Sequence, residues 1–352
     1  MSAVPVARCE SVRQEAGDIR VFTLRMHNAP EALMASVRPG GHVAIACPDA
    51  VGALQSRLYS VTRKDAPDLF EIAVKRSGRH SVSDHMHCVV REGSSVALQY
   101  AAGDVSVESV MGHERVAMIA GGIGITLPIA LIRELAARER QGIAVPEVVL
   151  MLCTRRVSDI AFLHELLALD LTSRWFTLRV FVTREVVRAS EHFSSGRPDA
   201  AALDVLGRPQ VAVICGSHAF AQACREQLGR RWPDLPLLVE AFTPPAVPAL
   251  AAPSEAQGQR PPVRLRIVGG DQVLEMAPGN SLLDMLASAN ISVRSQCRSG
   301  ICGCCRIRIA GGQCRFEPDF CLTEKDRRSG HVLACCTFPL AGEVELHLNQ
   351  PE

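Results

Sequence analysis

The sequence predicts a multidomain protein that combines an antiparallel β-barrel, a doubly wound α/β domain and a small α+β domain. Three observations predict it. Residues 1–107 hold short apolar strands punctuated by proline and glycine, and from about residue 115 strands alternate with helices. Eight of the fourteen cysteines lie between Cys297 and Cys336. Changes of pattern along a chain mark separate domains, and local use of cysteine indicates a site.

Length, composition and charge narrow the classes of function. A chain of 352 residues is too long for one ordinary domain, and 47% hydrophobic residues can fill sizeable cores. The net charge of +1 gives no electrostatic case for a nucleic-acid or membrane partner. The first residues lack the apolar core of a signal peptide, and glycines and a proline interrupt the longest apolar stretch, residues 116–132. We therefore expect a cytoplasmic protein.

The first region, residues 1–107, is expected to form a small barrel. Partial alternation of apolar and polar residues predicts strands over residues 19–26, 42–47, 57–63 and 69–75. Several short strands at this spacing, separated by turn residues, are typical of an antiparallel barrel.

The second region, residues 108–242, is expected to form a parallel sheet with helices on both faces. Strands are predicted over residues 116–120, 148–154, 177–182, 210–215 and 237–242. Helices are predicted up to about residue 137 and over residues 158–168 and 218–228. Alternation of strand and helix requires crossover connections, which make the sheet parallel.

A proline-rich linker, residues 243–262, precedes the last region, residues 263–352. Its prolines, mixed with alanine, serine and glutamine, predict an extended spacer. Beyond it we expect a hairpin (263–268 and 272–276), a helix (281–289) and strands over 306–310 and 343–348. These elements predict a small sheet that clasps one helix.

The cysteines of this last region have the spacing of a plant-type 2Fe–2S site. Cys297, Cys302 and Cys305 form C-x4-C-x2-C, and Cys335 follows thirty residues after Cys305. Glycines between the ligands allow the tight turns that such a loop needs. A zinc site would more naturally show two C-x2-C pairs, and a disulfide framework requires an oxidising compartment.

The neighbouring cysteines leave one alternative open. Cys336 adjoins Cys335 and could replace it as the fourth ligand. We expect the other cysteines of the region to be packing or surface thiols, namely Cys304, Cys314 and Cys321.

Three further motifs have the residue types of cofactor sites. Arg57-Leu58-Tyr59-Ser60 could contact a phosphate and an aromatic ring, although in isolation an exposed strand with a salt bridge explains these four residues better. The segment 78–83, with glycine, arginine and hydroxyls before a helical stretch, could cradle a phosphate. Gly121-Gly122-Ile123-Gly124 follows a buried strand and precedes a helix, although it is not the G-x-G-x-x-G fingerprint.

Cys215-Gly216 ends another strand of the predicted parallel sheet. A lone cysteine on a buried strand is usually core filling. At the carboxyl edge of a parallel sheet, however, it faces the crevice where ligands bind.

These motifs occur in an order that resembles the phthalate dioxygenase reductase-like proteins. The phthalate dioxygenase reductase-like proteins belong to the ferredoxin–NADP reductase superfamily, which includes the reductases of vanillate demethylase and related Rieske oxygenases. The resemblance implies an FMN-binding barrel (1–107), an NAD(H)-binding domain (108–242) and, after the linker 243–262, a β-grasp 2Fe–2S ferredoxin (263–352).

The resemblance also implies roles for single residues. Arg57 would hold the flavin phosphate, Tyr59 would pack along the flavin, and Ser60 would lie near its reactive nitrogen. Ser60, Thr126 and Cys215 are the expected catalytic residues. The remaining expected cofactor-binding residues are Leu58, Lys75, Arg79, Ser81, Gly122, Gly124, Thr154, Arg155, Gly216, Glu240 and Phe242.

Some positions depart from the family pattern. Leu127 separates Thr126 from the proline that usually follows it directly, and Ser217 stands where a proline is usual. Arg184 lies where acidic residues are common. Together with Arg155 and Arg156, it leaves NADPH open as an alternative to NADH, because arginines suit a 2′-phosphate.

The function implied is that of a reductase component of a Rieske-type oxygenase or demethylase. Electrons would pass from NAD(P)H through FMN and the 2Fe–2S cluster to the oxygenase, because a flavin can divide a two-electron hydride into single electrons. One alternative is an FAD- and NADPH-dependent reductase of a di-iron hydroxylase. The other is a non-enzymatic 2Fe–2S redox sensor or carrier, which would leave the first 240 residues without a purpose.

Overall fold

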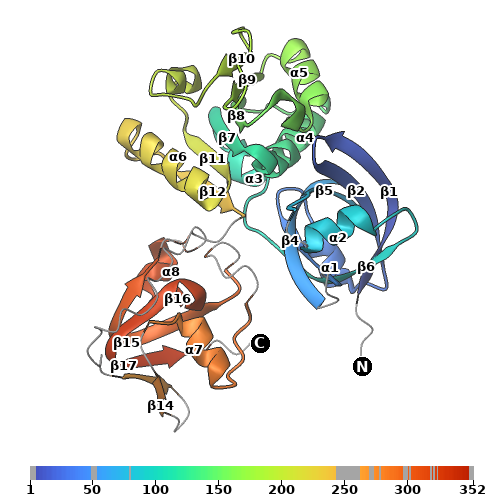
Figure 1. The fold of residues 1–352 in the computed structure, drawn as a ribbon. Coiled ribbons are helices and arrows are strands. Elements are labelled where there is room, and N and C mark those ends of the chain that lie inside the picture. Colours follow the sequence, from blue (N-terminus) through green and yellow to red (C-terminus); the bar gives the residue numbers. More distant parts are fainter. Residues whose placement is uncertain are drawn as a thin grey trace. The chain divides into compact units, whose positions relative to one another are not determined.

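The computed structural model divides the chain into two compact units, Met1–Ala241 and Phe242–Glu352. Figure 1 shows the fold of each unit. The structure describes residues 5–48, 54–78, 81–242, 262–268, 273–276, 279–295, 300, 303–317, 319, 322 and 324–348. The predicted linker thus lies almost wholly outside the described residues.

Unit 1 begins with a closed six-stranded barrel in the order β1-β2-β5-β4-β3-β6. Its strands are β1 (Val6–Ala16), β2 (Ile19–His27), β3 (His42–Pro48), β4 (Leu54–Ala66), β5 (Leu69–Lys75) and β6 (Ser95–Ala102). Two short helices accompany them, α1 (Glu31–Ser36) and α2 (Val82–Cys88). All strand pairs are antiparallel, as predicted.

The sequence did not single out the two strands that close the barrel. In β1 the fully buried side chains are the small Ala7 and Cys9, and charged residues stand on four of its other positions, so its apolar signal is weak. β6 pairs with both β1 and β3. Closure therefore depends on long-range pairing, which a local pattern does not reveal.

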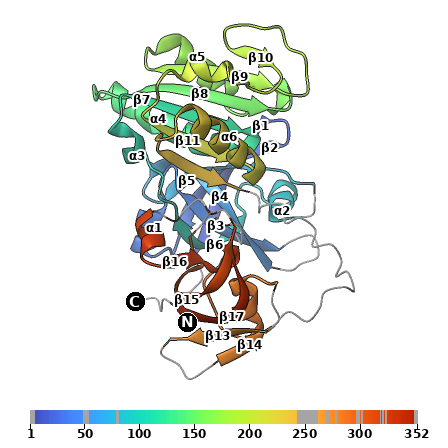
Figure 2. The same cartoon turned by 90° about the vertical axis from the view of Figure 1, so that its left-hand side faces the viewer.

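The second half of unit 1 is a six-stranded parallel sheet in the order β10-β9-β8-β7-β11-β12. Its strands are β7 (Arg115–Gly121), β8 (Glu147–Thr154), β9 (Phe176–Val182), β10 (Phe193–Ser195), β11 (Val211–Gly216) and β12 (Leu237–Ala241). The helices are α3 (Glu108–Met111), α4 (Thr126–Arg140), α5 (Leu163–Thr172) and α6 (His218–Arg231), with short 3-10 turns at Gly122–Ile125, Val157–Asp159 and Ala202–Leu206. Figure 2 shows α6 beside β11.

The order of strands reverses between β7 and β11. From β7 the chain builds outward to β10 on one side and, after returning, through β11 to β12 on the other. Such a reversal opens a crevice at the carboxyl ends of the strands, where doubly wound sheets bind ligands. The predicted helix 158–168 begins later, as α5, because Phe162 has a left-handed φ of 60° directly before it.

An ionic cluster centred on the buried Glu71 joins the barrel to the parallel-sheet half. The Glu71 carboxylate on β5 accepts hydrogen bonds from Arg13 (2.7 Å) and from Arg133 on α4 (2.8 Å). Burial would raise the pKa of Glu71, but the two guanidinium groups outweigh it and lower the pKa. Arg133 also bonds both oxygens of Glu165 on α5. This cluster fixes how the two halves of unit 1 meet.

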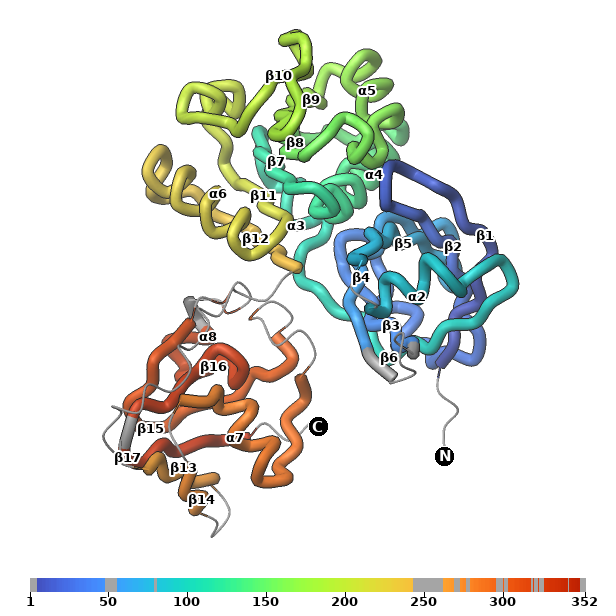
Figure 3. Tube along the Cα trace, in the orientation of Figure 1, coloured from blue at the N-terminus to red at the C-terminus, as the bar shows by residue number. Residues whose placement is uncertain are grey.

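Figure 3 follows the chain from one half to the other through α3.

Unit 2 is a five-stranded mixed sheet in the order β14-β13-β17-β15-β16. The strands are β13 (Val263–Ile267), β14 (Val273–Met276), β15 (Arg306–Phe316), β16 (His331–Leu333) and β17 (Thr337–His347). The helices are α7 (Leu282–Ser288) and α8 (Glu324–Arg328), and Ala334–Cys336 forms a 3-10 turn. The apolar face of α7 packs on the sheet in one core.

Two strands of unit 2 are longer than the sequence predicted. β15 continues past Ile309 through Gly311 and Gly312, where its pairing with β17 is irregular. Gly312 has φ of 113°, and a Cβ there would lie 2.7 Å from the Val344 side chain. The Gly-Gly pair reads as a strand end in sequence, but here it lets the strand bend and continue.

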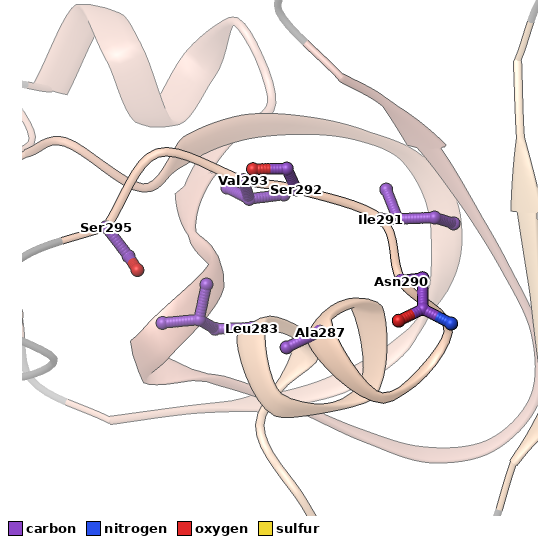
Figure 4. Close-up of a pocket in the computed structure, with 7 residues that line it drawn as sticks. All are labelled: Leu283, Ala287, Asn290, Ile291, Ser292, Val293 and Ser295. Carbon is purple, nitrogen blue, oxygen red and sulfur yellow. The ribbon is translucent and has the colours of Figure 1, made fainter.

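The hollow shown in Figure 4 lies beside α7 and has a volume of about 320 Å³. It is lined by Leu283, Ala287, Asn290, Ile291, Ser292, Val293 and Ser295. None of these described side chains is charged. Among the described residues, no helix is long and apolar enough to cross a membrane.

Candidate functional site

The structure brings two of the four expected cluster ligands together in unit 2. Cys305 lies directly before β15 and Cys335 lies in the turn between β16 and β17; both are buried. Their Sγ atoms are 3.3 Å apart. Two thiolates on one tetrahedral metal lie roughly 3.8 Å apart, because metal–sulfur bonds are about 2.3 Å long. A small adjustment would therefore place both sulfurs on one iron.

The glycines of the loop have the conformation that the sequence argument required. Gly300 has φ of 73° and Gly303 has φ of 68°, a region that side chains disfavour. The Gly300 N–H also hydrogen-bonds the Cys335 sulfur. A backbone donor aimed at a ligand sulfur is what a thiolate-bound cluster needs. Cys297 and Cys302 lie outside the described residues.

The other cysteines of unit 2 differ in position. Cys336 is buried, and its Sγ lies 3.6 Å from that of Cys335. Cys304 and Cys314 are half-buried, while Cys321 lies outside the described residues. The contact between Cys305 and Cys335 supports Cys335 as the fourth ligand, and this assignment stays a prediction.

In unit 1 the glycine turn after β7 packs tightly on the end of β11. A Cβ on Gly124 would lie 2.1 Å from the Cys215 carbonyl oxygen and 2.8 Å from the Gly216 Cα. Only glycine allows this approach. Gly122, with φ of 55°, has open space where a Cβ would stand. Thus Gly122, Gly124, Cys215 and Gly216 gather at the reversal point of the sheet.

An aromatic ring that the sequence argument overlooked lies at the same point. A Cβ on Gly121 would come within 2.9 Å of the Phe220 ring, and one on Gly216 within 2.7 Å. The ring of this α6 residue therefore covers both glycines. The space left by the missing side chain of Gly216 is thus filled by Phe220.

A buried polar group joins the barrel to the end of the parallel sheet. We use this name for Ser60 on β4, His42 on β3 and Glu240 on β12. The Ser60 hydroxyl donates to Glu240 Oε1 at 3.5 Å, and His42 Nδ1 lies 3.9 Å from the same oxygen. His42 stands directly opposite Ser60 in the β3–β4 pair, and Glu240 stands beside Cys215 in the β11–β12 pair. All three residues are at least nine-tenths buried.

Burial controls the protonation of this group. It raises the pKa of Glu240 to about 8, against the opposing effect of the Ser60 hydrogen bond. It lowers the pKa of His42 to about 4. Burial also raises the pKa of the Cys215 thiol well above 9.0. At neutral pH the group is therefore largely uncharged, and its His–Glu contact is not an ion pair.

Two polar atoms of the group have no partner in the described part of the chain. They are His42 Nε2 and Glu240 Oε2, both buried. Buried polar atoms are nearly always hydrogen-bonded, so unpaired atoms indicate a missing ligand. The residues present fit a polar heteroaromatic cofactor at this junction.

The residues expected to bind the flavin and its phosphate differ in burial and in hydrogen-bond partners. Tyr59 is buried in the barrel core, and its hydroxyl lies 3.0 Å from the Ser83 hydroxyl. Arg57 is exposed on the same strand and donates to the Ser56 carbonyl. Ser81 caps α2, where its N–H and hydroxyl both bond the Asp84 carboxylate. Asp84 thus takes donors that the sequence argument had offered to a phosphate, while Arg79 lies outside the described residues.

The remaining expected cofactor-binding residues lie on several different elements of the structure. Lys75 Nζ lies 3.4 Å from Asp18 Oδ1. Thr126 is the first residue of α4, and its hydroxyl donates a hydrogen bond to the Ile123 carbonyl. Thr154 is buried at the end of β8, followed by the exposed Arg155. Leu58 and Phe242 are half-buried, and Phe242 belongs to unit 2.

His42, Asp84 and Phe220 are the residues that the sequence argument missed. His42 follows Pro39-Gly40-Gly41, so the sequence places it at the start of a strand. The sequence does not show that it would lie near Glu240. Asp84 lies three residues after Ser81, the spacing of a helix cap. Phe220 lies in the first turn of α6, near the strand end that carries Cys215 and Gly216.

Two family models match the chain. A 2Fe-2S iron-sulfur cluster binding domain matches residues 265–340, a range that contains all four expected ligand cysteines. A ferric reductase NAD binding domain matches residues 113–202, the sheet from β7 to β10.

Relatives and solved structures match over nearly the full length. The glycine betaine monooxygenase reductase subunit of Pseudomonas aeruginosa is 24% identical, over 95% of this chain and 93% of its own length. The vanillate O-demethylase oxidoreductase of Pseudomonas putida is 27% identical over 96% of each chain. The fold is similar to that of phthalate dioxygenase reductase, with a TM-score of 0.53, 20% identity and 97% of each chain covered.

Proposed function

Because the chain is a relative of the reductase components of oxygenase and demethylase systems, we propose that it carries electrons from a reduced pyridine nucleotide to a Rieske-type oxygenase. The resemblance predicted from the sequence is confirmed by these relatives and the two matching domains. The predicted fold class is confirmed as well. The chain is thus an NAD(P)H-dependent electron-transfer oxidoreductase.

The contact between Ser60 and Glu240 is the observation that carries the proposal. These residues are 180 positions apart, yet their side chains meet within a buried junction at 3.5 Å. The contact places the strand of the expected flavin residues against the carboxyl edge of the NAD-binding sheet. A flavin held by β4 would therefore meet a nicotinamide that enters over Gly122 and Gly124. Such positioning is the main task in hydride transfer.

The residues of the junction would bind and orient rather than act as strong acids or bases. A flavin, when bound, accepts a hydride and releases electrons one at a time. The Ser60 hydroxyl and the neutral Glu240 carboxyl can hydrogen-bond its polar edge, and Glu240 can hold a proton on Oε2. The buried, neutral Cys215 and the Phe220 ring would exclude water from the crevice.

The sulfur site of unit 2 would hold the cluster that receives single electrons. We use this name for Cys305 and Cys335 with Gly300 and Gly303, and we propose Cys297 and Cys302 as the other ligands. Thiolate ligands are typical of a reducing compartment, so we propose a cytoplasmic location. The oxygenase partner would take electrons from this site.

The experiment that tests the proposal replaces one ligand and follows two acceptors. In Cys305→Ser, NAD(P)H-driven cytochrome c reduction should fall at least about 100-fold, since loss of a ligand exceeds the 10–100-fold cost of losing its supporting contacts. Ferricyanide reduction at the flavin should persist. Cys314→Ser is the matched control, because it removes a half-buried thiol of the same unit that is no expected ligand. Equal loss of both activities in Cys305→Ser would contradict the electron order.

The identity of the flavin has a separate test. We propose FMN, by the family resemblance. Acid release of the flavin from purified protein, followed by chromatography, distinguishes FMN from FAD. Recovery of FAD would favour the alternative reductase of a di-iron hydroxylase.

A further inference from the structure

A cleft in unit 1 lies between the end of β4 and the helices α4 and α5, and the proposed electron path does not use it. Its volume is about 640 Å³, which is the size of a pocket for a small organic molecule. The α4 residues that line it lie between positions 132 and 140, in the second half of the helix. Because α4 runs back from the end of β7 to the start of β8, this half lies towards the amino ends of the strands. The cleft is therefore at the end of the sheet opposite the crevice.

Part of the cleft is apolar and is built largely from small side chains. Six of its fourteen lining residues are apolar, and three of these are alanines that leave room between α4 and α5. Such a surface binds the apolar body of a ligand because both lose contact with water. The apolar lining residues are Ile132, Ala136, Ala137, Leu166, Ala168 and Leu169.

The charged lining residues are four basic and three acidic ones, and several of them already have partners. The charged residues are Arg63, Lys64, Arg133, Arg140, Asp65, Glu134 and Glu165. Arg133 and Glu165 bond each other within the ionic cluster. Lys64 Nζ donates to the Met34 carbonyl (2.7 Å) and to the Val37 carbonyl (2.9 Å) at the end of α1. Arg63 and Arg140 are the cations that remain.

Arg63 and Arg140 have no carboxylate partner among the described residues. Arg63 stands opposite Glu71 in the β4–β5 pair, but the Glu71 oxygens already accept hydrogen bonds from the two arginines of the ionic cluster. Arg140 donates its Nε to the Ala136 carbonyl at 3.1 Å, which leaves its two terminal nitrogens. Both guanidinium groups can therefore bind an anion in the cleft.

Two acidic residues of the cleft oppose such an anion only weakly. Burial raises the pKa of Glu134, and although Arg138 lowers it, the net effect favours the neutral carboxyl. Asp65 is exposed, so water and salt screen its charge. The cleft thus combines an excess of positive charge with an apolar surface.

We propose that this cleft binds an organic monocarboxylate, with its carboxylate on Arg63 and Arg140 and its apolar body on the alanines of α4 and α5. Guanidinium groups bind carboxylates through charge-assisted and often bidentate hydrogen bonds. An organic cation would be repelled by the same two groups, and a neutral molecule would leave them without a counter-charge. This ligand site is separate from the proposed electron path, so either can fail without the other.

Isothermal titration calorimetry of the full chain with sodium octanoate and with sodium benzoate tests the site. The wild type should bind at least one of these acids with a Kd below about 1 mM, and the better ligand distinguishes an aliphatic from an aromatic body. Octylammonium has the same chain as octanoate with the opposite charge, and it should bind at least about tenfold more weakly than the better acid. Absence of saturable binding of either acid, or equal binding of octylammonium, would overturn the proposal.

Two variants remove different parts of the site. Arg63→Gln should weaken binding of the better acid about tenfold, because a charge-assisted hydrogen bond is lost. Ala168→Leu should weaken it at least about fivefold, because the larger side chain fills the apolar part of the cleft. Arg225→Gln and Ala223→Leu are the matched controls, since both positions are exposed on α6, and they should leave the affinity unchanged. Unchanged affinity in both Arg63→Gln and Ala168→Leu would contradict the assignment of the cleft.

Urea unfolding gives a second measure of the same site. At ten times its Kd, the better acid should raise the urea midpoint of the wild type and of Arg225→Gln, because a ligand that binds only the folded chain stabilises it. The rise should be smaller in Arg63→Gln. Trp175 and Trp232 both belong to unit 1, so tryptophan fluorescence reports its unfolding. A midpoint that stays constant or falls in the wild type would show that the acid does not bind a folded site, and the proposal would be wrong.

Discussion

The sulfur site of unit 2 and the buried polar group of unit 1 differ in how far apart their residues lie in the sequence. Gly300, Gly303 and Cys305 of the sulfur site lie within six residues of sequence, and Cys335 joins them. The buried polar group joins β3, β4 and β12, and Ser60 and Glu240 are 180 positions apart. The first site is therefore encoded locally, whereas the second exists only once the barrel and the parallel sheet have met.

The two sites also differ in what their environment does to their chemistry. Hydrogen bonds from Cys305 and from the Gly300 N–H lower the pKa of the Cys335 thiol, but the contact with Cys336 and burial outweigh them and raise it. In the buried polar group, burial removes charge from Glu240 and from His42. The sulfur site should therefore respond most to replacement of a ligand cysteine. The buried polar group should respond most to changes in packing and in pH.

The largest expected effect separates Cys335 from Cys336. Cys335→Ser should lower the iron content of purified protein from the full complement to near zero, because its sulfur lies 3.3 Å from that of Cys305. Cys336→Ser is the control and should retain the iron and the visible spectrum. Retention of iron in Cys335→Ser together with loss in Cys336→Ser would assign the fourth ligand to Cys336.

A second large effect concerns the packing of unit 1. Gly124→Ala should lower the free energy of unfolding by about 3 kcal/mol or more, because the new Cβ would lie 2.1 Å from a backbone oxygen that cannot move cheaply. Urea unfolding followed by tryptophan fluorescence measures this unit, since Trp175 and Trp232 both belong to it.

Gly229→Ala is the matched control for that measurement. Gly229 lies in α6 with no atom near its missing Cβ, so alanine should stabilise the helix by about 0.5–1 kcal/mol. Unchanged stability in Gly124→Ala would mean that the glycine turn does not pack on β11 as described.

The same contrast explains how much could be predicted from the sequence. The cysteine spacing and its positive-φ glycines were visible because a loop carries its own pattern. The parallel sheet was visible too, through apolar runs such as residues 116–121 of β7 and 211–216 of β11. The closing strands of the barrel and the position of His42 opposite Ser60 were not, because register between distant strands decides them. The Phe220 ring was missed for a similar reason: α6 must first pack on β11.

The smallest expected effect is a pH dependence that only the long-range site can produce. Glu240 has a folded pKa of about 8, above its ordinary 4.5, so its contribution to stability is present at low pH and is lost as pH rises through 8. His42 has a folded pKa of about 4, below its ordinary 6.5, so stability is lost as pH falls from 6.5 towards 4. Between pH 4.5 and 6.5 the two slopes oppose each other, and above 6.5 that of Glu240 alone remains.

Glu240→Gln tests this arrangement in the flavin-free protein. Between pH 6.5 and 8 the wild type should lose roughly 1–2 kcal/mol of unfolding free energy relative to the variant, since one pKa unit corresponds to about 1.4 kcal/mol. His42→Gln should leave this loss unchanged and should expose a fall in stability between pH 4.5 and 6.5, which the opposing slope of His42 cancels in the wild type. Urea titrations at pH 5, 6.5 and 8, followed by tryptophan fluorescence, measure all three proteins. A constant difference between wild type and Glu240→Gln from pH 6.5 to 8 would mean that the Glu240 carboxyl is hydrated rather than enclosed between β4 and β12.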